Sequence, residues 1–209
     1  YPKEQEYGYA SNEDLYVPGY FEMHIKKGES IVFAASTSDI KTSTLKHLFD
    51  KEVEDRAPRD NFFHCLVNAA HQFHNRTSKD ERYILAGYPW FKCRARDTFI
   101  SLPGLTLAID EQDYFELVMK TAERGAREFM KGEPLTVKIT EMDQPDVFLW
   151  AIWAIQQYAK AAGDEKCLSM YGEFVKDILC YIIDGKHPNL RLDANGLVYT
   201  ECINLIALD

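Results

Sequence analysis

The chain has 209 residues, of which 46% are hydrophobic and 27% are charged, enough apolar residues for a sizeable buried core. Its formal net charge of −9 argues against a nucleic-acid partner, since proteins that bind phosphate backbones carry a basic face. No apolar run is long enough to span a bilayer, so no membrane association is expected. The five cysteines are odd in number and lack C-x-x-C spacing, which favours free thiols and a cytoplasmic location.

The first 41 residues differ in pattern from the rest of the chain. Residues 16–24 are rich in aromatic side chains and are broken by Pro18-Gly19, and residues 29–35 form a short β-branched and aromatic run. Both patterns predict β-strands, although two strands are marginally stable alone. We therefore expect residues 1–41 to be the end of an N-terminal β-sandwich domain or a linker.

Residues 42–209 are expected to be mainly α-helical. Five helices are predicted from apolar residues at helical spacing, over residues 60–74, 97–109, 110–130, 145–162 and 164–183. Asp60, Asp97 and Asp110 are the predicted N-caps of the first three helices, and Pro145 is predicted at the first position of the fourth. After the fifth helix, residues 190–199 predict a β-hairpin.

The helices differ in how much of their surface is apolar. The fourth predicted helix has almost no polar face, which indicates burial on every side, whereas the third carries charged residues typical of a solvated outer helix. This alternation favours a partial (α/α)6 toroid of helical hairpins. The toroid would be incomplete, because closing one takes about twelve helices. An incomplete ring exposes an apolar wall, so we expect self-association through it.

The stretch YPWFKCRARDTFISLPG, residues 88–104, carries the first candidate site. Three aromatic and three basic residues precede Asp97: Tyr88, Trp90, Phe91, Lys92, Arg94 and Arg96. A carbohydrate pocket needs this mixture, because sugars present apolar ring faces to aromatics and hydroxyls to charged groups. A helix start and the adjacent Arg96 favour an ionised Asp97, which would hold a sugar rather than protonate it. Alternatively, Asp97 is a plain N-cap and the aromatic rings pack against the helices.

The segment MDQPDVFLW, residues 142–150, carries the second candidate site. Asp146 is a candidate general acid, because its apolar neighbours would raise its carboxyl pKa, although a helix start lowers it. Alternatively, Asp143 is a cap and Asp146 a first-turn acid, and the sequence leaves open which of them faces a substrate. Trp150 is a candidate sugar-stacking ring or a core residue. We expect Asp97 and Asp146 to meet at the rim of one sugar cavity.

No metal or cofactor is expected. His64, His71 and His74 lie on one predicted helix, but no carboxylate or thiol in the sequence pattern completes a metal site with them. No glycine-rich phosphate loop or zinc-protease pattern is present.

Three segments resemble a known family. AGYPWF and RDTFISLPGL, within residues 86–105, resemble the signature of the C-terminal amylo-α-1,6-glucosidase domain of glycogen debranching enzymes. DVFLWAIWAIQQY, residues 146–158, resembles a later segment of that domain, and residues 13–30 resemble the end of the β-sandwich that precedes it. The resemblance implies a glucoamylase-like (α/α)6 toroid and inverting hydrolysis of α-1,6 branch linkages in a glycogen-like glucan or oligosaccharide.

The resemblance also implies roles for individual residues. Arg96 and Asp97 would bind the terminal glucose, and Asp146 would be the general acid. The other candidate substrate-binding residues are Tyr88, Trp90, Phe91, Arg94, Asp143 and Trp150.

The sequence departs from the family pattern in two ways. Arg94-Ala95 stands where the family often has Trp-Gly, and no segment before Asp209 matches the family's general-base glutamate. We therefore expect a fragment of a larger enzyme that is inactive, or nearly so, by itself. The alternatives are a carbohydrate-binding module without turnover and a helical scaffold for protein partners.

Overall fold

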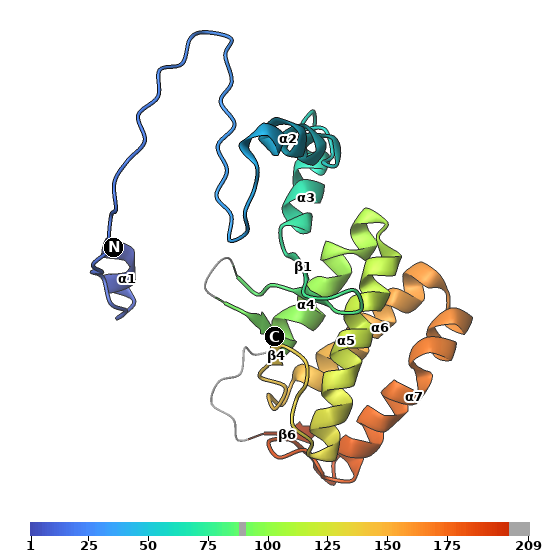
Figure 1. Ribbon diagram of the computed structural model, residues 1–209. Coiled ribbons are helices and arrows are strands. Elements are labelled where there is room, and N and C mark those ends of the chain that lie inside the picture. Colours follow the sequence, from blue (N-terminus) through green and yellow to red (C-terminus); the bar gives the residue numbers. More distant parts are fainter. Residues whose placement is uncertain (88–90, 201–209) are drawn as a thin grey trace. The chain divides into compact units, whose positions relative to one another are not determined.

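The structure is a computed structural model that describes residues 1–87 and 91–200 (Figure 1). Contacts within the chain divide it into two compact units, Tyr1–Asp55 and Arg56–Asp209. Helices dominate the described residues and the strands are few and short, which confirms a mainly α protein. Among the described residues, no helix combines the length and the apolar character that crossing a bilayer demands.

The first unit contains little regular structure. It has the helix α1 (Pro2–Glu6), the 3-10 turn η1 (Thr42–Thr44) and the helix α2 (Leu45–Glu54), none of which buries a residue. The two strands predicted over residues 16–24 and 29–35 are wrong, because neither segment pairs with a neighbour.

The strands over residues 16–24 and 29–35 were predicted wrongly because of the many aromatic residues in these segments. The rings of Phe21 and Phe33 meet edge to face with centroids 5.1 Å apart, so the two segments do contact each other. Tyr16, however, remains 91% exposed. A strand pair is marginal without a further surface to cover one of its faces, and nothing within this unit buries these side chains.

The second unit holds the five predicted helices, and their existence is confirmed. They are α3 (Phe62–His71), α4 (Ala95–Leu105), α5 (Gln112–Lys131), α6 (Val147–Ala162) and α7 (Asp164–Ile183), with a 3-10 turn η2 (Leu107–Ile109) between α4 and α5. The last two helices are separated only by Gly163, whose positive φ of 92° favours glycine and reverses the chain.

Several helix starts differ from the prediction by one to three residues. Asn61, not Asp60, caps α3, and its side chain accepts a hydrogen bond from the backbone N–H of His64 at 2.8 Å. Asp97 lies inside the first turn of α4 and is not its N-cap. Pro145 precedes α6, whose N-cap position is taken by Asp146. Local sequence places a helix well, but the choice between neighbouring capping residues depends on the incoming chain.

Within residues 1–87 and 91–200, six short strands form three pairs. They are β1 (His74–Arg76) with β2 (Arg82–Ile84), β3 (Cys93–Arg94) with β4 (Ile139–Thr140), and β5 (Arg191–Leu192) with β6 (Val198–Tyr199). The last pair confirms the hairpin predicted over residues 190–199. The parallel β3–β4 pair brings the segment before α4 beside the segment before α6.

Helices α4 to α7 enclose the core of this unit (Figure 1). α4 packs against α6, and α6 packs against α7. Fully buried aromatic side chains contributed by α4, α5, α6 and α7 fill the space between them: Phe99, Phe115, Phe148, Tyr158 and Phe174. The rings of Phe115 and Tyr158 stack with centroids 4.9 Å apart, which joins α5 to α6.

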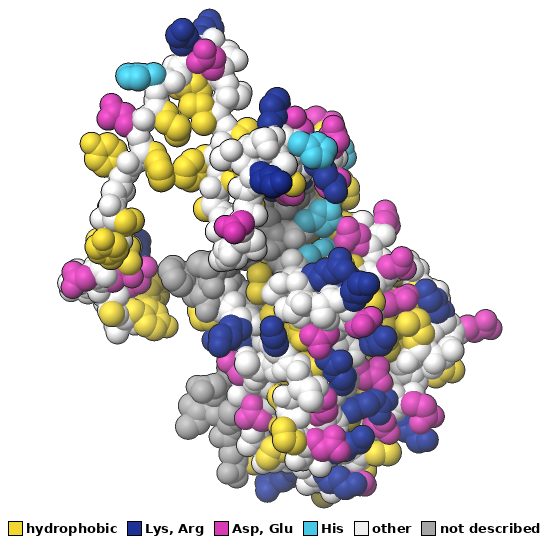
Figure 2. Space-filling model, viewed as in Figure 1, with side chains coloured by type: hydrophobic (Ala, Val, Ile, Leu, Met, Phe, Trp, Pro, Cys, Tyr) yellow, Lys and Arg dark blue, Asp and Glu magenta, His cyan; other side chains and the backbone are white. Residues whose placement is uncertain are grey.

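The burial predicted from the sequence is confirmed for α5 but not for α6. α5 buries one stripe and exposes the other, where basic and acidic side chains intermingle in Figure 2, so its solvated face is confirmed. α6 is not buried on every side, since Trp153 keeps 36% exposure and Trp150 is half-buried. The side of α6 that α4 and α7 cover is buried, and the remaining apolar side is only partly covered by the described residues.

Candidate functional site

The starts of α4 and α6 are joined by a buried ion pair between Arg96 and Asp146. The guanidinium Nε donates to Oδ2 at 2.6 Å and Nη2 donates to Oδ1 at 2.8 Å, a two-pronged geometry that only arginine can make. The side chains are 11% and 5% exposed. The hydrogen bond to Asp146 raises the pKa of Arg96 above its usual value.

Trp150 completes this cluster. One turn along α6, its indole Nε1 donates to Oδ2 of Asp146 at 3.2 Å. Its ring also meets Trp153 edge to face, with centroids 5.4 Å apart. Asp146 therefore accepts three hydrogen bonds from groups that cannot accept one.

Arg94 and Phe91 form a second, more exposed cluster beside β3. The guanidinium carbon of Arg94 lies 4.6 Å from the centroid of the Phe91 ring, a cation–π contact, and its Nε lies 3.2 Å from Glu141 Oε1. Glu141 sits just after β4 with a positive φ of 59°. Sequence reasoning missed Glu141. The only indication in the sequence was an acidic residue two positions before Asp143. That indication is weak, because nothing in the sequence shows that β3 and β4 pair.

Asp97 lines a small hollow beside α4. It lines a cavity of about 210 Å³ with six other residues, and Asp146 is not among them: Phe73, Leu85, Ala86, Ile100, Ser101 and Leu105. The expectation that Asp97 and Asp146 meet at the rim of one sugar cavity stays a prediction. Arg96 does not line this hollow, because adjacent residues on a helix such as Arg96 and Asp97 point in different directions.

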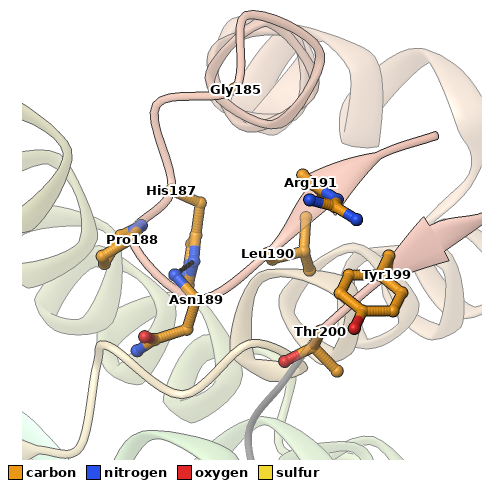
Figure 3. A pocket seen from close by; sticks show the side chains of 8 residues that line it. All are labelled: Gly185, His187, Pro188, Asn189, Leu190, Arg191, Tyr199 and Thr200. Carbon is orange, nitrogen blue, oxygen red and sulfur yellow. Dashed lines mark hydrogen bonds between the residues drawn. The ribbon is translucent and has the colours of Figure 1, made fainter.

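Another hollow, of about 380 Å³, lies in the segment that follows α7 (Figure 3). Its walls combine an aromatic ring, a guanidinium, an amide and a hydroxyl, contributed by Tyr199, Arg191, Asn189 and Thr200. The Arg191 guanidinium carbon lies 4.3 Å from the Tyr199 ring centroid. Sequence reasoning missed this hollow, because it treated residues 190–199 only as a hairpin.

A hydrogen bond links the hollow after α7 to the segment that precedes α6. The side-chain amide of Asn189 donates to the backbone carbonyl of Asp143 at 3.0 Å. Asp143 as a residue is exposed. His187, 4% exposed, packs among aromatic rings of α5, α6 and α7, and its Nδ1 accepts the backbone N–H of Asn189 at 3.1 Å. Burial lowers the pKa of His187, which keeps the ring neutral.

Two of the predicted substrate-binding residues, Tyr88 and Trp90, lie outside the described residues. Of the remaining candidates, the structure brings together Arg96, Asp146 and Trp150 in one cluster, and Phe91 and Arg94 in another. Asp97 and Asp143 belong to neither.

The premise that no carboxylate accompanies the histidines near α3 is wrong. His71 Nε2 lies 2.7 Å from Oε1 of Glu111, and His74 Nδ1 lies 3.6 Å from its Oε2. His64 does not take part, because its Nδ1 lies 2.6 Å from Asp60. Glu111 is the residue just before α5, 40 positions after His71, so the sequence offered no spacing signal.

Two protein families match the chain. The family described as amylo-alpha-1,6-glucosidase matches residues 67–205, and the one described as glycogen debranching enzyme N terminal matches residues 1–32. No curated protein and no solved structure matches the chain. Because the first match covers more than half of the chain and includes both helices joined by the Arg96–Asp146 pair, the chain belongs to the amylo-alpha-1,6-glucosidase family of the glycogen debranching enzymes.

Proposed function

We propose that the chain contributes part of a glycosidase site that hydrolyses α-1,6 branch linkages in a glycogen-like glucan with inversion. One observation carries the proposal: within the matched region, a buried and two-pronged Arg96–Asp146 pair joins the starts of two core helices. A charge pair with so little exposure is costly to bury, and such sites are candidates for function rather than stability. The free thiols of the four described cysteines are compatible with action in the cytoplasm.

The architecture proposed for this site is part of an (α/α)6 toroid. α4 and α6 lie together with their starts at the same end, and α7 returns antiparallel to α6 after Gly163. This supports inner positions for α4 and α6 and outer positions for α5 and α7, whose charged faces are solvated. The substrate would then bind at the end where Arg96 and Asp146 lie.

Asp97 and Arg96 have distinct proposed roles. Asp97, in the first turn of α4, would accept hydrogen bonds from glucose hydroxyls in the hollow that it lines. Arg96 would release Asp146 when it turns toward the bound glucose. Phe91 and Arg94, on the exposed side of β3, would contact the sugar beyond the cleaved bond.

Asp146 is the proposed general acid. Asp146 is 5% exposed, and once Arg96 turns away its carboxyl group would face the substrate. It could then give its proton to the glycosidic oxygen. Inversion also needs a second carboxylate, roughly 6.5–9.5 Å away, to activate water. None of the described residues is assigned this role, so we expect the 209-residue chain to release almost no glucose by itself.

The test is glucose release from an isomaltosyl or panosyl substrate by a debranching enzyme that contains this chain. Asp146→Asn is expected to lower kcat by about 10²–10⁴-fold, the usual contribution of a general acid. The matched variant is Asp143→Asn, an exposed acid three residues away, which should leave kcat nearly unchanged. If Asp146→Asn turns over normally, the assignment is wrong, and if only Asp143→Asn is inactive, the acid is Asp143.

A second function is a glucan-binding module without turnover. It is favoured by the closed state of Asp146, whose oxygens are occupied by Arg96 and Trp150, and by Arg94-Ala95 at the place of the family's Trp-Gly. Binding of maltose, isomaltose and glycogen to the chain, measured by calorimetry, separates both carbohydrate functions from a protein-binding scaffold. Binding with no turnover in the longer enzyme would favour the module.

A further inference from the structure

Two imidazoles and one carboxylate converge near the end of α3. His71 is the last residue of α3, His74 is the first residue of β1, and Glu111 directly precedes α5. The three candidate ligand atoms all lie within 4.8 Å of one another. The two histidine rings are 5.4 Å apart between centroids, tilted so that a nitrogen of each faces the carboxylate.

The tautomer of His74 exposes a lone pair toward Glu111. Its Nε2 lies 2.9 Å from the backbone carbonyl of Leu105, and because a carbonyl only accepts, Nε2 carries the hydrogen. In the neutral ring, Nδ1 is then an unprotonated acceptor that faces a carboxylate oxygen at 3.6 Å. Two acceptors at this separation repel each other unless a proton or a metal ion lies between them.

The surroundings of His74 are those of a metal ligand. Histidines that bind metals usually donate their other ring N–H to a carbonyl or carboxylate, which holds the ring and the tautomer, and Leu105 supplies that carbonyl here. The ring is further held by Tyr114, which stacks on it with centroids 3.9 Å apart and 13° between the planes. His74 is therefore oriented before any ion arrives.

We propose that His71, His74 and Glu111 bind one Zn²⁺ ion, with a fourth position left to water. Two histidines and one glutamate are a known zinc ligand set with an open position. Zinc and its transition-metal neighbours are preferred over Mg²⁺ or Ca²⁺, because imidazole nitrogen is a poor ligand for those two ions. His71 and Glu111 are partly exposed, which provides an entry path for the ion.

The ion would join three segments that are distant in sequence. α3, β1 and the start of α5 meet at these three residues, and Leu105, whose carbonyl holds His74, also lines the hollow of Asp97. Zn²⁺ would therefore stiffen one wall of that hollow. Zn²⁺ binding itself does not depend on the glycosidase proposal, since none of the three ligands belongs to the Arg96–Asp146 cluster.

The test measures Zn²⁺ binding to the chain with a chromophoric competitor, together with the shift of its melting temperature. Cys65, Cys180 and Cys202 are changed to Ser in every variant, because two of these thiols are exposed and the third lies outside the described residues. We expect one saturable site and a rise in Tm that depends on Zn²⁺ concentration. Co²⁺ substitution should give the absorption bands of a four-coordinate site.

Three variants decide the assignment. His71→Ala and Glu111→Gln should each weaken Zn²⁺ affinity by at least about 100-fold, because even the partners of metal ligands contribute 10–100-fold. His64→Ala, on the same helix and paired with a different acid, should keep full affinity. Circular dichroism checks folding, and if one variant is unfolded the other decides.

Three results would overturn the proposal: no Zn²⁺ binding by the parent chain, full binding in the folded ligand variants, or equal loss in His64→Ala. If the parent chain binds no Zn²⁺ and the variants still have a lower Tm than the parent, the three residues form ion pairs only.

Discussion

At the residue scale, the Arg96–Asp146 pair is the most consequential contact in the second unit. Its two charges come from positions 50 residues apart, yet both side chains are almost fully withdrawn from water. Burial of both charges costs several kcal/mol, which the two short hydrogen bonds and the Trp150 N–H offset only in part. The pair therefore specifies how α4 and α6 start side by side more than it stabilises them.

Replacing only one residue of the Arg96–Asp146 pair should lower the free energy of unfolding far more than replacing both. Arg96→Met leaves a buried carboxylate without a cation and is expected to lower the free energy of unfolding by about 3–5 kcal/mol. The double variant Arg96→Met with Asp146→Leu should recover most of that loss, because no charge stays unpaired. Urea denaturation measures both.

The exposed pair Arg94–Glu141 provides the control for this comparison. Arg94→Met should cost less than about 1 kcal/mol, since both side chains are more than one-third exposed. Equal losses for Arg94→Met and Arg96→Met would contradict the importance assigned to burial.

At the element scale, the distance between α5 and the loop that follows it depends on a glycine. A Cβ on Gly125 would lie 2.5 Å from Cγ2 of Val137, a buried side chain with no room to move. In α7, a Cβ on Gly172 would instead meet only Cδ1 of Leu168 at 2.9 Å, the end of a mobile and 73% exposed side chain. The two helix-interior glycines therefore exist for different reasons.

Alanine at these two positions should change stability in opposite directions. Gly125→Ala forces the buried Val137 aside, and with a contact as short as 2.5 Å the cost lies at the upper end of the usual overpacking range, about 3 kcal/mol; a helix-propensity gain of about 1 kcal/mol offsets only part of it. Gly172→Ala keeps the propensity gain and should stabilise the chain by about 0.5–1 kcal/mol. Chemical denaturation of both variants under the same conditions is the measurement. A stabilised Gly125→Ala would mean that α5 and Val137 are not in close contact.

At the scale of the whole molecule, an apolar groove runs between α6 and α7. It has a volume of about 430 Å³, and Ile155, Tyr171 and Val175 line its floor while Leu168 stands at its edge. α7 also carries Leu179 and Ile183 with large exposed fractions. Exposed apolar surface of this kind favours association, which agrees with the face expected for an incomplete ring of helices.

Self-association through this groove is a measurable expectation. Light scattering should show a mean mass that rises with concentration, and Leu168→Lys should reduce the rise by placing a charge at the groove. Leu197→Lys, an equally exposed leucine on the β5–β6 hairpin, is the matched control and should leave association unchanged. A chain that stays monomeric at all concentrations would refute the expectation.

The sequence predicted much more of the elements than of the site. Five helices and the last hairpin follow from local features, namely apolar spacing, capping residues and turn residues. The strands of residues 16–24 and 29–35 failed, because a strand depends on a partner that local sequence does not supply. The sequence singled out Arg96, Asp146 and Trp150 individually, and their roles stay predictions. Their contacts with one another were not anticipated.

By itself, the sequence determined the helical class of the second unit and the family to which the chain belongs, since periodicity and motif are properties of neighbouring residues. Only the tertiary structure decided that Arg96 closes on Asp146, that Asp97 lines a hollow beside α4, and that Glu111 joins His71 and His74. Such contacts cross 40 to 50 residues of chain, and their geometry depends on how helices pack and on which side of a helix each residue faces.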